Sequence, residues 1–258
     1  MSSFHSTIAL AMRNVLKLCV VSPTVLRQQL MPDVAPIDPA ATASRIRVAG
    51  RTLAKAGLVH AYGHCSTRIG ENQFLVSPAK PLGLLAADDA PVIVATTGKL
   101  PKGALPEVIA HQHIYRRRAE VGGVVRFQSP HIMALSALGR TPRALHGFGA
   151  YFAPCPPLHS DPRLVRDDAS AAALVERLGG GRAIVMRGNG AITAGASLEE
   201  AVALAWYLED AARVELAVLS TGLEPQVFTA DEVRDRAIDV GSMLQRLWNW
   251  MSANDPEL

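Results

Sequence analysis

A carboxylate and an imidazole lie four residues apart just after Pro106. A proline in the first turn and an acid beside it are typical of a helix start, so we expect a helix from Pro106 to about Arg118. Glu107, His111 and Tyr115 would then share one face of that helix. A carboxylate beside an imidazole can accept and return a proton, which predicts general acid–base roles for Glu107 and His111. The alternative is an ordinary N-terminal acid that pairs with a neighbouring side chain.

The other histidines give weaker indications. His131 follows Pro130 at the expected start of another helix, where it either lines a site or caps the helix. His146 lies in a loop-rich segment, and functional polar residues are often found on loops. The spacing of Glu107, His111 and His131 matches no recognised set of metal ligands. We therefore treat His131 and His146 as substrate-binding candidates and not as metal ligands.

Length and composition describe a protein with one substantial core. The chain has 258 residues, is 49% hydrophobic and carries a formal net charge of +3, so it needs no second domain. The basic residues are scattered, which argues against nucleic-acid binding. No apolar run reaches the roughly 18 residues of a membrane span. Three cysteines without paired spacing fit a reducing compartment. We expect a cytoplasmic protein that binds neither nucleic acid nor membrane.

The N-terminal segment differs from the rest in charge. Residues 1–31 contain basic residues but no Asp or Glu, as a transit peptide does. An N-terminal helix that packs on the body or on a neighbouring subunit is the interpretation we favour. Prolines at three positions within 32–39 then indicate a linker. We expect residues 1–40 to form an extension and linker, and residues 41–258 to form the domain.

Hydrophobic periodicity predicts short strands between helices. Ser197 with Glu200 has the spacing of a capping box before a long helix, and Thr229 with Glu232 has it before the last helix. The absence of strict strand–helix–strand alternation predicts an α/β domain with a central β-sheet covered by helices. The expected strands lie at 73–77, 90–96, 123–127 and 183–186, and the expected helices at 43–56, 106–118, 130–138 and 198–219.

Five segments, taken in order, resemble the class II aldolase/adducin family. They extend from about Ile46 to Leu219, and their order and spacing are specific although each motif alone is weak. The resemblance implies a single class II aldolase-like domain with three α/β/α layers, and it places Glu107 at the family's catalytic acid. The segments are Gly57-Leu58-Val59 with Gly63-His64-Cys65-Ser66-Thr67-Arg68; Ser77-Pro78 with Gly83; Pro106-Glu107 with His111 and Ile114-Tyr115-Arg116; Val124-Val125-Arg126-Phe127-Gln128-Ser129-Pro130; and Arg187-Gly188-Asn189-Gly190 with Ser197-Leu198-Glu199-Glu200-Ala201.

The first segment is closer to one branch of the family. Its Gly-His-x-Ser-x-Arg pattern resembles the decarboxylases of dihydroxy-aromatic and pyridine carboxylic acids, whereas sugar-phosphate aldolases usually have Asn in place of His64. This implies a small carboxylate as substrate, with the backbone amides around Gly63 available to hold an anion. The expected substrate-binding residues are Gly63, His64, Ser66, Ser77, Tyr115, His131 and His146.

The family's metal-binding residues are replaced in this chain. The resemblance implies three histidines that hold zinc or manganese, and their positions are occupied by Arg126, Gln128 and Asn189. Arginine offers no lone pair and the two amides are weak ligands, so we expect no metal cofactor. A guanidinium can instead hold a carboxylate or an enolate, with the amides as further donors. The alternative is an inactive pocket in which Arg126 is solvated or ion-paired.

The resemblance favours a metal-independent lyase. Glu107 would move a proton while Arg126, Gln128 and Asn189 stabilise an enolate-like intermediate of decarboxylation or retro-aldol cleavage. One alternative is an isomerase, cyclase or dehydratase that uses the same base. Another is a catalytically inactive, adducin-like partner in assembly. The family usually forms a ring of four, and the apolar C-terminal end around Trp248 is compatible with a homotetramer.

Overall fold

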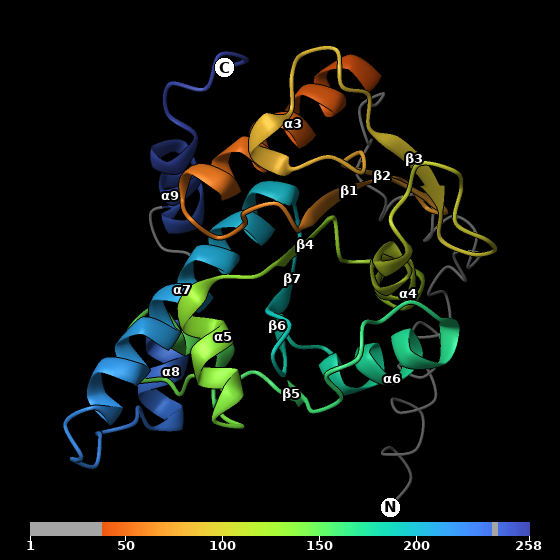
Figure 1. Ribbon diagram of the computed structural model, residues 1–258. Helices are drawn as coiled ribbons and strands as arrows, with labels where there is room; N and C mark the ends of the chain where they lie inside the picture. The colour runs from red at the N-terminus through yellow and green to blue at the C-terminus, as the bar shows by residue number, and fades with distance from the viewer. Residues whose placement is uncertain (1–37, 239–241) are drawn as a thin grey trace, which may run out of the picture. The chain divides into compact units, whose positions relative to one another are not determined.

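A seven-stranded sheet forms the centre of the computed structural model, which describes residues 38–238 and 242–258 (Figure 1). The strands are β1 (His64–Gly70), β2 (Gln73–Val76), β3 (Val92–Ala95), β4 (Gly123–Phe127), β5 (Leu158–His159), β6 (Ala183–Met186) and β7 (Ala191–Gly195). Their order across the sheet is β3-β2-β1-β4-β7-β6-β5. Neighbours pair antiparallel except β5 and β6. The expectations for residues 1–31 lie outside the described residues.

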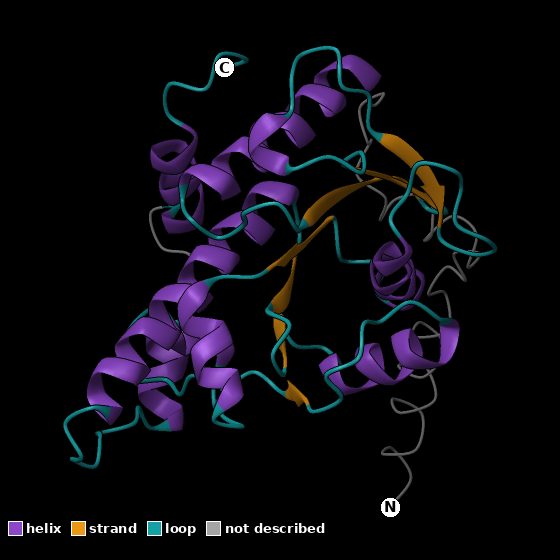
Figure 2. Cartoon of the chain, in the orientation of Figure 1, coloured by secondary structure: helices purple, strands orange, loops and turns teal. Residues whose placement is uncertain are grey.

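Helices cover both faces of this sheet, which confirms the α/β/α prediction (Figure 2). Cys65, Val125 and Phe127 face a core shared with α3, α5, α7 and α9, whereas Phe74 and Val124 face a core shared with α4 and α6. This is the alternation expected of strands that are buried on both sides. The helices are α3 (Pro39–Lys55), α4 (Ile109–Arg117), α5 (Pro130–Ala137), α6 (Asp168–Leu178), α7 (Leu198–Leu219), α8 (Ala230–Arg236) and α9 (Met243–Ser252).

Most predicted elements are present within a few residues of their expected bounds. Helix α7 has the predicted span, and Ser197 caps it by accepting a hydrogen bond from the backbone N–H of Glu200. Thr229 and Glu232 form a capping box, but α8 ends at Arg236 and α9 follows, so the expectation that this box starts the last helix is wrong. Among the described helices, none is long and apolar enough to cross a bilayer.

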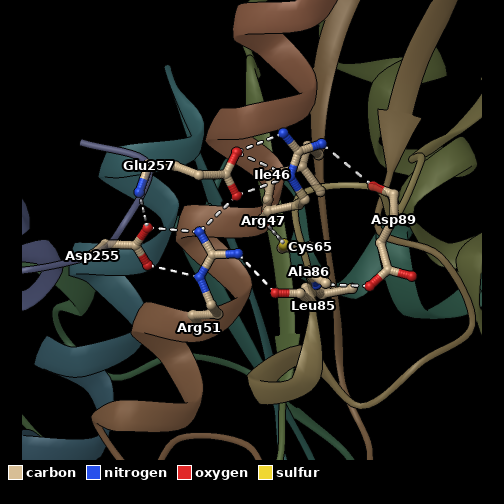
Figure 3. Close-up of polar contacts among 9 residues, drawn as sticks. All are labelled: Ile46, Arg47, Arg51, Cys65, Leu85, Ala86, Asp89, Asp255 and Glu257. Atoms are coloured by element: carbon tan, nitrogen blue, oxygen red, sulfur yellow. Dashed lines mark hydrogen bonds and ion pairs between the residues drawn. The ribbon is translucent and has the colours of Figure 1, made fainter.

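The C-terminal residues are attached to α3 by a C-terminal ion-pair cluster of Arg47, Arg51, Asp255 and Glu257 (Figure 3). Arg51 Nη2 lies 2.6 Å from Asp255 Oδ1, and Arg47 Nη2 lies 2.5 Å from Glu257 Oε2. The hydrogen bond from Arg47 is the main cause that lowers the pKa of Glu257 to about 2. Both guanidinium groups are therefore neutralised within the chain.

Candidate active site

A cavity of about 500 Å³ lies at adjoining ends of β1 and β4. Its walls come from segments far apart in the sequence, namely 61–64, 79–81, 105–107, 164–166 and the turn between β6 and β7. Four of the five expected catalytic residues line it, together with two expected binding residues and two cations that the sequence did not indicate. These lining residues are Glu107, Arg126, Gln128 and Asn189; Gly63 and His64; and Lys80 and Arg166.

Strand pairing places His64 and Arg126 in the cavity wall. The two residues are opposite partners on β1 and β4, so their side chains project to the same face of the sheet. That is the face covered by α4. The neighbouring pair on the two strands, Cys65 and Val125, points to the opposite face and belongs to the core there. Gly63 precedes His64 and has φ +149, and a Cβ on this glycine would lie 2.6 Å from Val59. The turn into β1 therefore requires glycine.

The turn between β6 and β7 brings Asn189 to the end of β4. Gly190 makes this approach possible, because it has φ +79 and a Cβ there would lie 2.0 Å from the carbonyl oxygen of Phe127. Asn189 Oδ1 accepts hydrogen bonds from Arg126 Nη2 at 2.6 Å and from Gln128 Nε2 at 2.9 Å. The three residues that replace the expected histidines thus form one hydrogen-bonded group.

Arg126 is a buried cation whose hydrogen-bond partners among the described residues are uncharged. Its exposed fraction is 7%, and its hydrogen bonds go to the side-chain and backbone oxygens of Asn189. Among the described residues, no acid lies within ion-pair distance of its guanidinium. Burial lowers the pKa of Arg126, and the charge of Glu107 opposes this shift from a greater distance. A buried charge that lacks a close counterion is destabilising, so this part of the cavity favours an anion.

Glu107 is paired with an arginine instead of a histidine. It lies in a 3-10 turn, η2 (Pro106–Val108), that precedes α4, and its carboxylate is 2.7 Å from Arg166 Nη2. The expected contact between Glu107 and His111 is wrong, because His111 is fully buried and bonds elsewhere. A 3-10 turn has about 3.0 residues per turn, so it rotates Glu107 away from the face that His111 and Tyr115 share on α4.

A chain of four buried polar side chains starts at the cavity wall and leads inward. His64 Nδ1 lies 2.9 Å from His111 Nε2, His111 Nδ1 lies 2.6 Å from Ser66 Oγ, and Ser66 Oγ lies 2.9 Å from Tyr115 Oη. Burial lowers the pKa of both imidazoles, that of His111 to about 3, and raises that of the Tyr115 phenol. Of these four residues only His64 lines the cavity, so His111, Ser66 and Tyr115 stand behind it.

Three further candidates lie away from the cavity. The hydroxyl of Ser77 accepts a hydrogen bond from the backbone N–H of Cys65. His131 Nδ1 lies 2.7 Å from Glu209, which also accepts from the backbone N–H of His131 at the start of α5. His146 lies 3.9 Å from Asp210. Both acids belong to α7, and neither histidine lines the cavity. The alternative that His131 caps α5 is wrong as well, because Glu209 accepts the N–H groups of His131 and Ile132 at the helix start.

Lys80 and Arg166 are cavity residues that the sequence analysis missed. Lys80 follows the Ser77-Pro78 motif by two residues and pairs with Asp89 at 2.6 Å. Arg166 lies in the loop before α6, where no motif marks it. The closeness of Lys80 to a family motif was the one signal available.

The family model for the Class II Aldolase and Adducin N-terminal domain matches residues 44–216. The chain belongs to this family. The 3,4-dihydroxyphthalate decarboxylase of Arthrobacter keyseri is 30% identical over 207 residues, which cover 73% of this chain and 83% of that protein. The L-fuculose phosphate aldolase of Haemophilus influenzae is 28% identical over 178 residues, which cover 67% and 80%. The expected family and its decarboxylase branch are thereby confirmed.

Solved structures agree on the fold of this class II aldolase family member. An aldolase II superfamily protein from Pseudomonas syringae superposes with a TM-score of 0.71 at 21% identity, over 88% of this chain and 94% of that one. The L-fuculose-1-phosphate aldolase of Thermus thermophilus superposes with a TM-score of 0.64 at 26% identity, over 73% and 100%. The predicted class II aldolase-like domain is therefore confirmed.

The metal implied by the class II aldolase resemblance does not suit the residues at its expected position. Arg126 has no lone pair to donate. Asn189 Oδ1 already accepts two hydrogen bonds, from Arg126 and Gln128. In the part of the chain that the structure describes, no group of three or more His, Cys, Asp or Glu is arranged to hold an ion. These three side chains suit an anion better than a cation.

Proposed function

We propose that this class II aldolase family member is a metal-independent lyase that cleaves a carbon–carbon bond of a small carboxylate, with decarboxylation of an oxygenated aromatic acid as its reaction. The proposal rests on Arg126, because its guanidinium is buried in the cavity wall and is hydrogen-bonded to the neutral side chain of Asn189. Its parallel N–H groups match the oxygens of a carboxylate or an enolate. A bound acid would supply the counterion that none of the described residues places there.

Cavity size and charge support an acid of about one ring. A volume of about 500 Å³ falls in the range of small-molecule sites. Lys80 and Arg166 add two cations at the cavity, although each is partly offset by an acid of the chain. The decarboxylase of Arthrobacter keyseri is named for an aromatic acid with two carboxylates and two hydroxyls. Several cations around one cavity fit a substrate with more than one acidic group.

The chain's own residues supply the two functions that decarboxylation requires. The proton of a ring hydroxyl is first moved to the ring carbon that bears the carboxylate, which turns that oxygen into a carbonyl. The bond to the carboxylate carbon then breaks, carbon dioxide leaves, and the electron pair moves through the ring onto the same oxygen. Arg126 and the amides of Gln128 and Asn189 would stabilise that oxygen as it gains charge. Glu107, the carboxylate that lines the cavity, would take the hydroxyl proton and deliver it to the ring carbon before carbon dioxide leaves.

The proposed function is tested by carbon dioxide release from chelator-treated protein. The panel should contain 3,4-dihydroxyphthalate, other hydroxylated aromatic acids and hydroxylated aliphatic acids. We expect release from at least one aromatic acid with no metal added. Failure of every acid would contradict the proposal, as would an activity that appears only after zinc or manganese is added.

Replacing the cavity carboxylate should stop turnover without unfolding the protein. Glu107→Gln keeps the shape of the side chain but cannot carry the proton, so we expect carbon dioxide release to fall about 10²- to 10⁴-fold. Circular dichroism and thermal unfolding should stay as in the wild type. Glu120→Gln is the matched control, because this acid is exposed and pairs with Arg118 outside the cavity. A fully active Glu107→Gln variant would remove Glu107 from the mechanism.

A further inference from the structure

The buried polar chain behind the cavity has one open end. It runs from His64 through His111 and Ser66 to Tyr115. Its atom without a hydrogen-bond partner among the described residues is His64 Nε2. Nδ1 of the same ring is bonded to His111 behind the wall, so Nε2 is the buried nitrogen that remains for a partner on a ring that lines the cavity.

Tyr115 sets the direction of hydrogen bonding along this chain. The hydrogen-bond partner of its hydroxyl among the described residues is Ser66 Oγ, and a buried phenol proton needs an acceptor. The phenol proton therefore goes to Ser66, the Ser66 proton to His111 Nδ1, and the His111 Nε2 proton to His64 Nδ1. The neutral ring of His64 must then carry its own proton on Nε2. The reverse direction would leave a buried phenol proton without an acceptor among these groups.

We propose that His64 is a catalytic hydrogen-bond donor whose Nε2–H binds the substrate oxygen that gains negative charge, and that His111, Ser66 and Tyr115 are positioning residues that hold this tautomer. The inference rests on the proposed function, since it adds a second donor to the anion that Arg126 binds. His64 and Arg126 are opposite partners on β1 and β4, so both donors reach the cavity from adjacent strands. A donor fixed in place before the reaction costs no reorganisation when charge develops.

The surrounding charges keep the His64 ring neutral. Burial lowers its pKa well below the usual range, and His111 and Arg126 act in the same direction. Lys80 and Arg166 are further cations that line the cavity, and Glu107 is the acid among its lining residues. A donor of this kind needs no proton uptake, so its hydrogen bond should not change across neutral pH.

Nitrogen NMR of the full-length protein labelled with ¹⁵N-histidine reads the tautomer directly. We expect the His64 signals, assigned by their loss in His64→Gln, to show a protonated Nε2 and a bare Nδ1 between about pH 6 and pH 8. Tyr115→Phe removes the proton that starts the chain and should mix the two tautomers. Tyr151→Phe, which removes a phenol bonded to the carbonyl of Ile238, should leave them unchanged. A ring protonated on Nδ1, or one that gains a proton in this range, would overturn the proposal.

Turnover tests whether this donor acts on the substrate. His64→Leu should lower kcat about 100-fold, and His64→Gln should recover at least about tenfold of that loss because its amide N–H replaces Nε2–H. Tyr115→Phe should lower kcat about three- to tenfold with KM within about twofold, whereas Tyr151→Phe should not lower it. Equal kcat values for the Leu and Gln variants, or a Leu variant as active as the wild type, would overturn the role of His64.

These readouts separate the inference from the proposed function on which it rests. The NMR experiment needs no turnover, so it decides the tautomer even if the reaction is wrong. Calorimetric binding of phthalate to wild type and to Arg126→Met reports on the proposed function alone. If Arg126→Met loses phthalate binding while His64→Leu keeps wild-type turnover, the anion site at Arg126 stands and the proposed role of His64 is wrong.

Discussion

The arginines of the C-terminal ion-pair cluster and Arg126 differ in whether acids among the described residues offset their charge. Arg47 and Arg126 are similarly buried, with 9% and 7% of their surface exposed. Arg47, with Arg51, meets the carboxylates of Glu257 and Asp255 in the C-terminal ion-pair cluster. Arg126 meets amide oxygens from Asn189 and has no close acid among the described residues. Burial alone therefore does not mark a functional arginine.

The two environments also shift the arginine pKa in opposite directions. Hydrogen bonds with carboxylates raise the pKa of Arg47 and Arg51, whereas burial lowers that of Arg126. A cation whose charge is offset within the fold contributes to structure. A cation whose charge is not offset favours binding of an external anion, and its position in a cavity makes it accessible to that anion.

Replacing the cavity arginine should have the largest effect on activity. Arg126→Met should lower kcat/KM about 10²- to 10³-fold, because it removes the main stabilisation of the developing charge. Stability should be unchanged or higher, since an apolar side chain of similar volume replaces a buried charge without a close counterion. Steady-state kinetics and thermal unfolding measure both. An active but less stable variant would mean that Arg126 is a structural residue like Arg51.

Replacing an arginine of the C-terminal ion-pair cluster should give the opposite result. The Asp255 side chain is nearly buried, and Arg51→Met removes its ion-pair partner. We therefore expect a loss of about 2 kcal/mol in the free energy of unfolding. The kcat/KM of the folded variant should stay within about twofold of wild type. Arg45→Met is the control on the same helix, because its ion pair with Glu199 is half exposed and should contribute less than about 1 kcal/mol. Equal losses in both variants in urea unfolding would contradict this contrast.

Acid should act on the two regions in different pH windows. Burial lowers the pKa of His111 from 6.5 to about 3, so below pH 6.5 the unfolded chain binds a proton that the folded chain does not. Stability should then fall toward pH 3, by about 2 kcal/mol at pH 5 for this group. The pKa of Glu257 is lowered from 4.5 to about 2, so its stabilising contribution is complete above pH 4.5 and is lost only as the pH falls from there toward 2.

Two variants separate these windows in denaturant unfolding. His111→Gln should make stability less dependent on pH between about pH 6.5 and pH 5, because the variant has no imidazole to protonate on unfolding. Glu257→Gln should leave the slope in that range as in the wild type. If His111→Gln keeps the full wild-type slope there, the assignment of the acid sensitivity to this buried imidazole is wrong.

Chelation should have the smallest effect. The three residues at the family's metal position form a hydrogen-bonded group that suits an anion, so we expect incubation with EDTA to leave carbon dioxide release unchanged. The measurement compares rates before and after chelation, with elemental analysis of the same samples. A loss of activity that zinc or manganese restores would show that the reaction needs a metal, which these side chains do not explain.

The sequence predicted the parts of the site that depend on strand periodicity and on turns with glycine. Arg126 and Gln128 are two apart at the end of one strand and so face the same side. Asn189 lies in a turn between two glycines, of which Gly190 passes close to β4. Those local patterns, matched to the family in order, were sufficient to place all three in one cavity.

The sequence could not predict which side chains distant in the chain contact each other in the site. Nothing local to Glu107 indicates that Arg166, from a loop 59 residues later, reaches its carboxylate. The 3-10 turn at Pro106–Val108 also could not be distinguished from the first turn of α4, although it decides which side chain Glu107 faces. Helix α6 was missed as well, despite a capping box in which Asp167 and Ser170 bond to each other.

Calorimetric titration of phthalate into metal-stripped protein tests most directly whether Arg126 is an anion site that works without a metal. Wild type and Arg51→Met should bind with the same affinity, and Arg126→Met should bind at least about tenfold more weakly, as expected for loss of a charged hydrogen-bond partner. Equal affinity of wild type and Arg126→Met, or binding that appears only when zinc or manganese is added, would contradict the account.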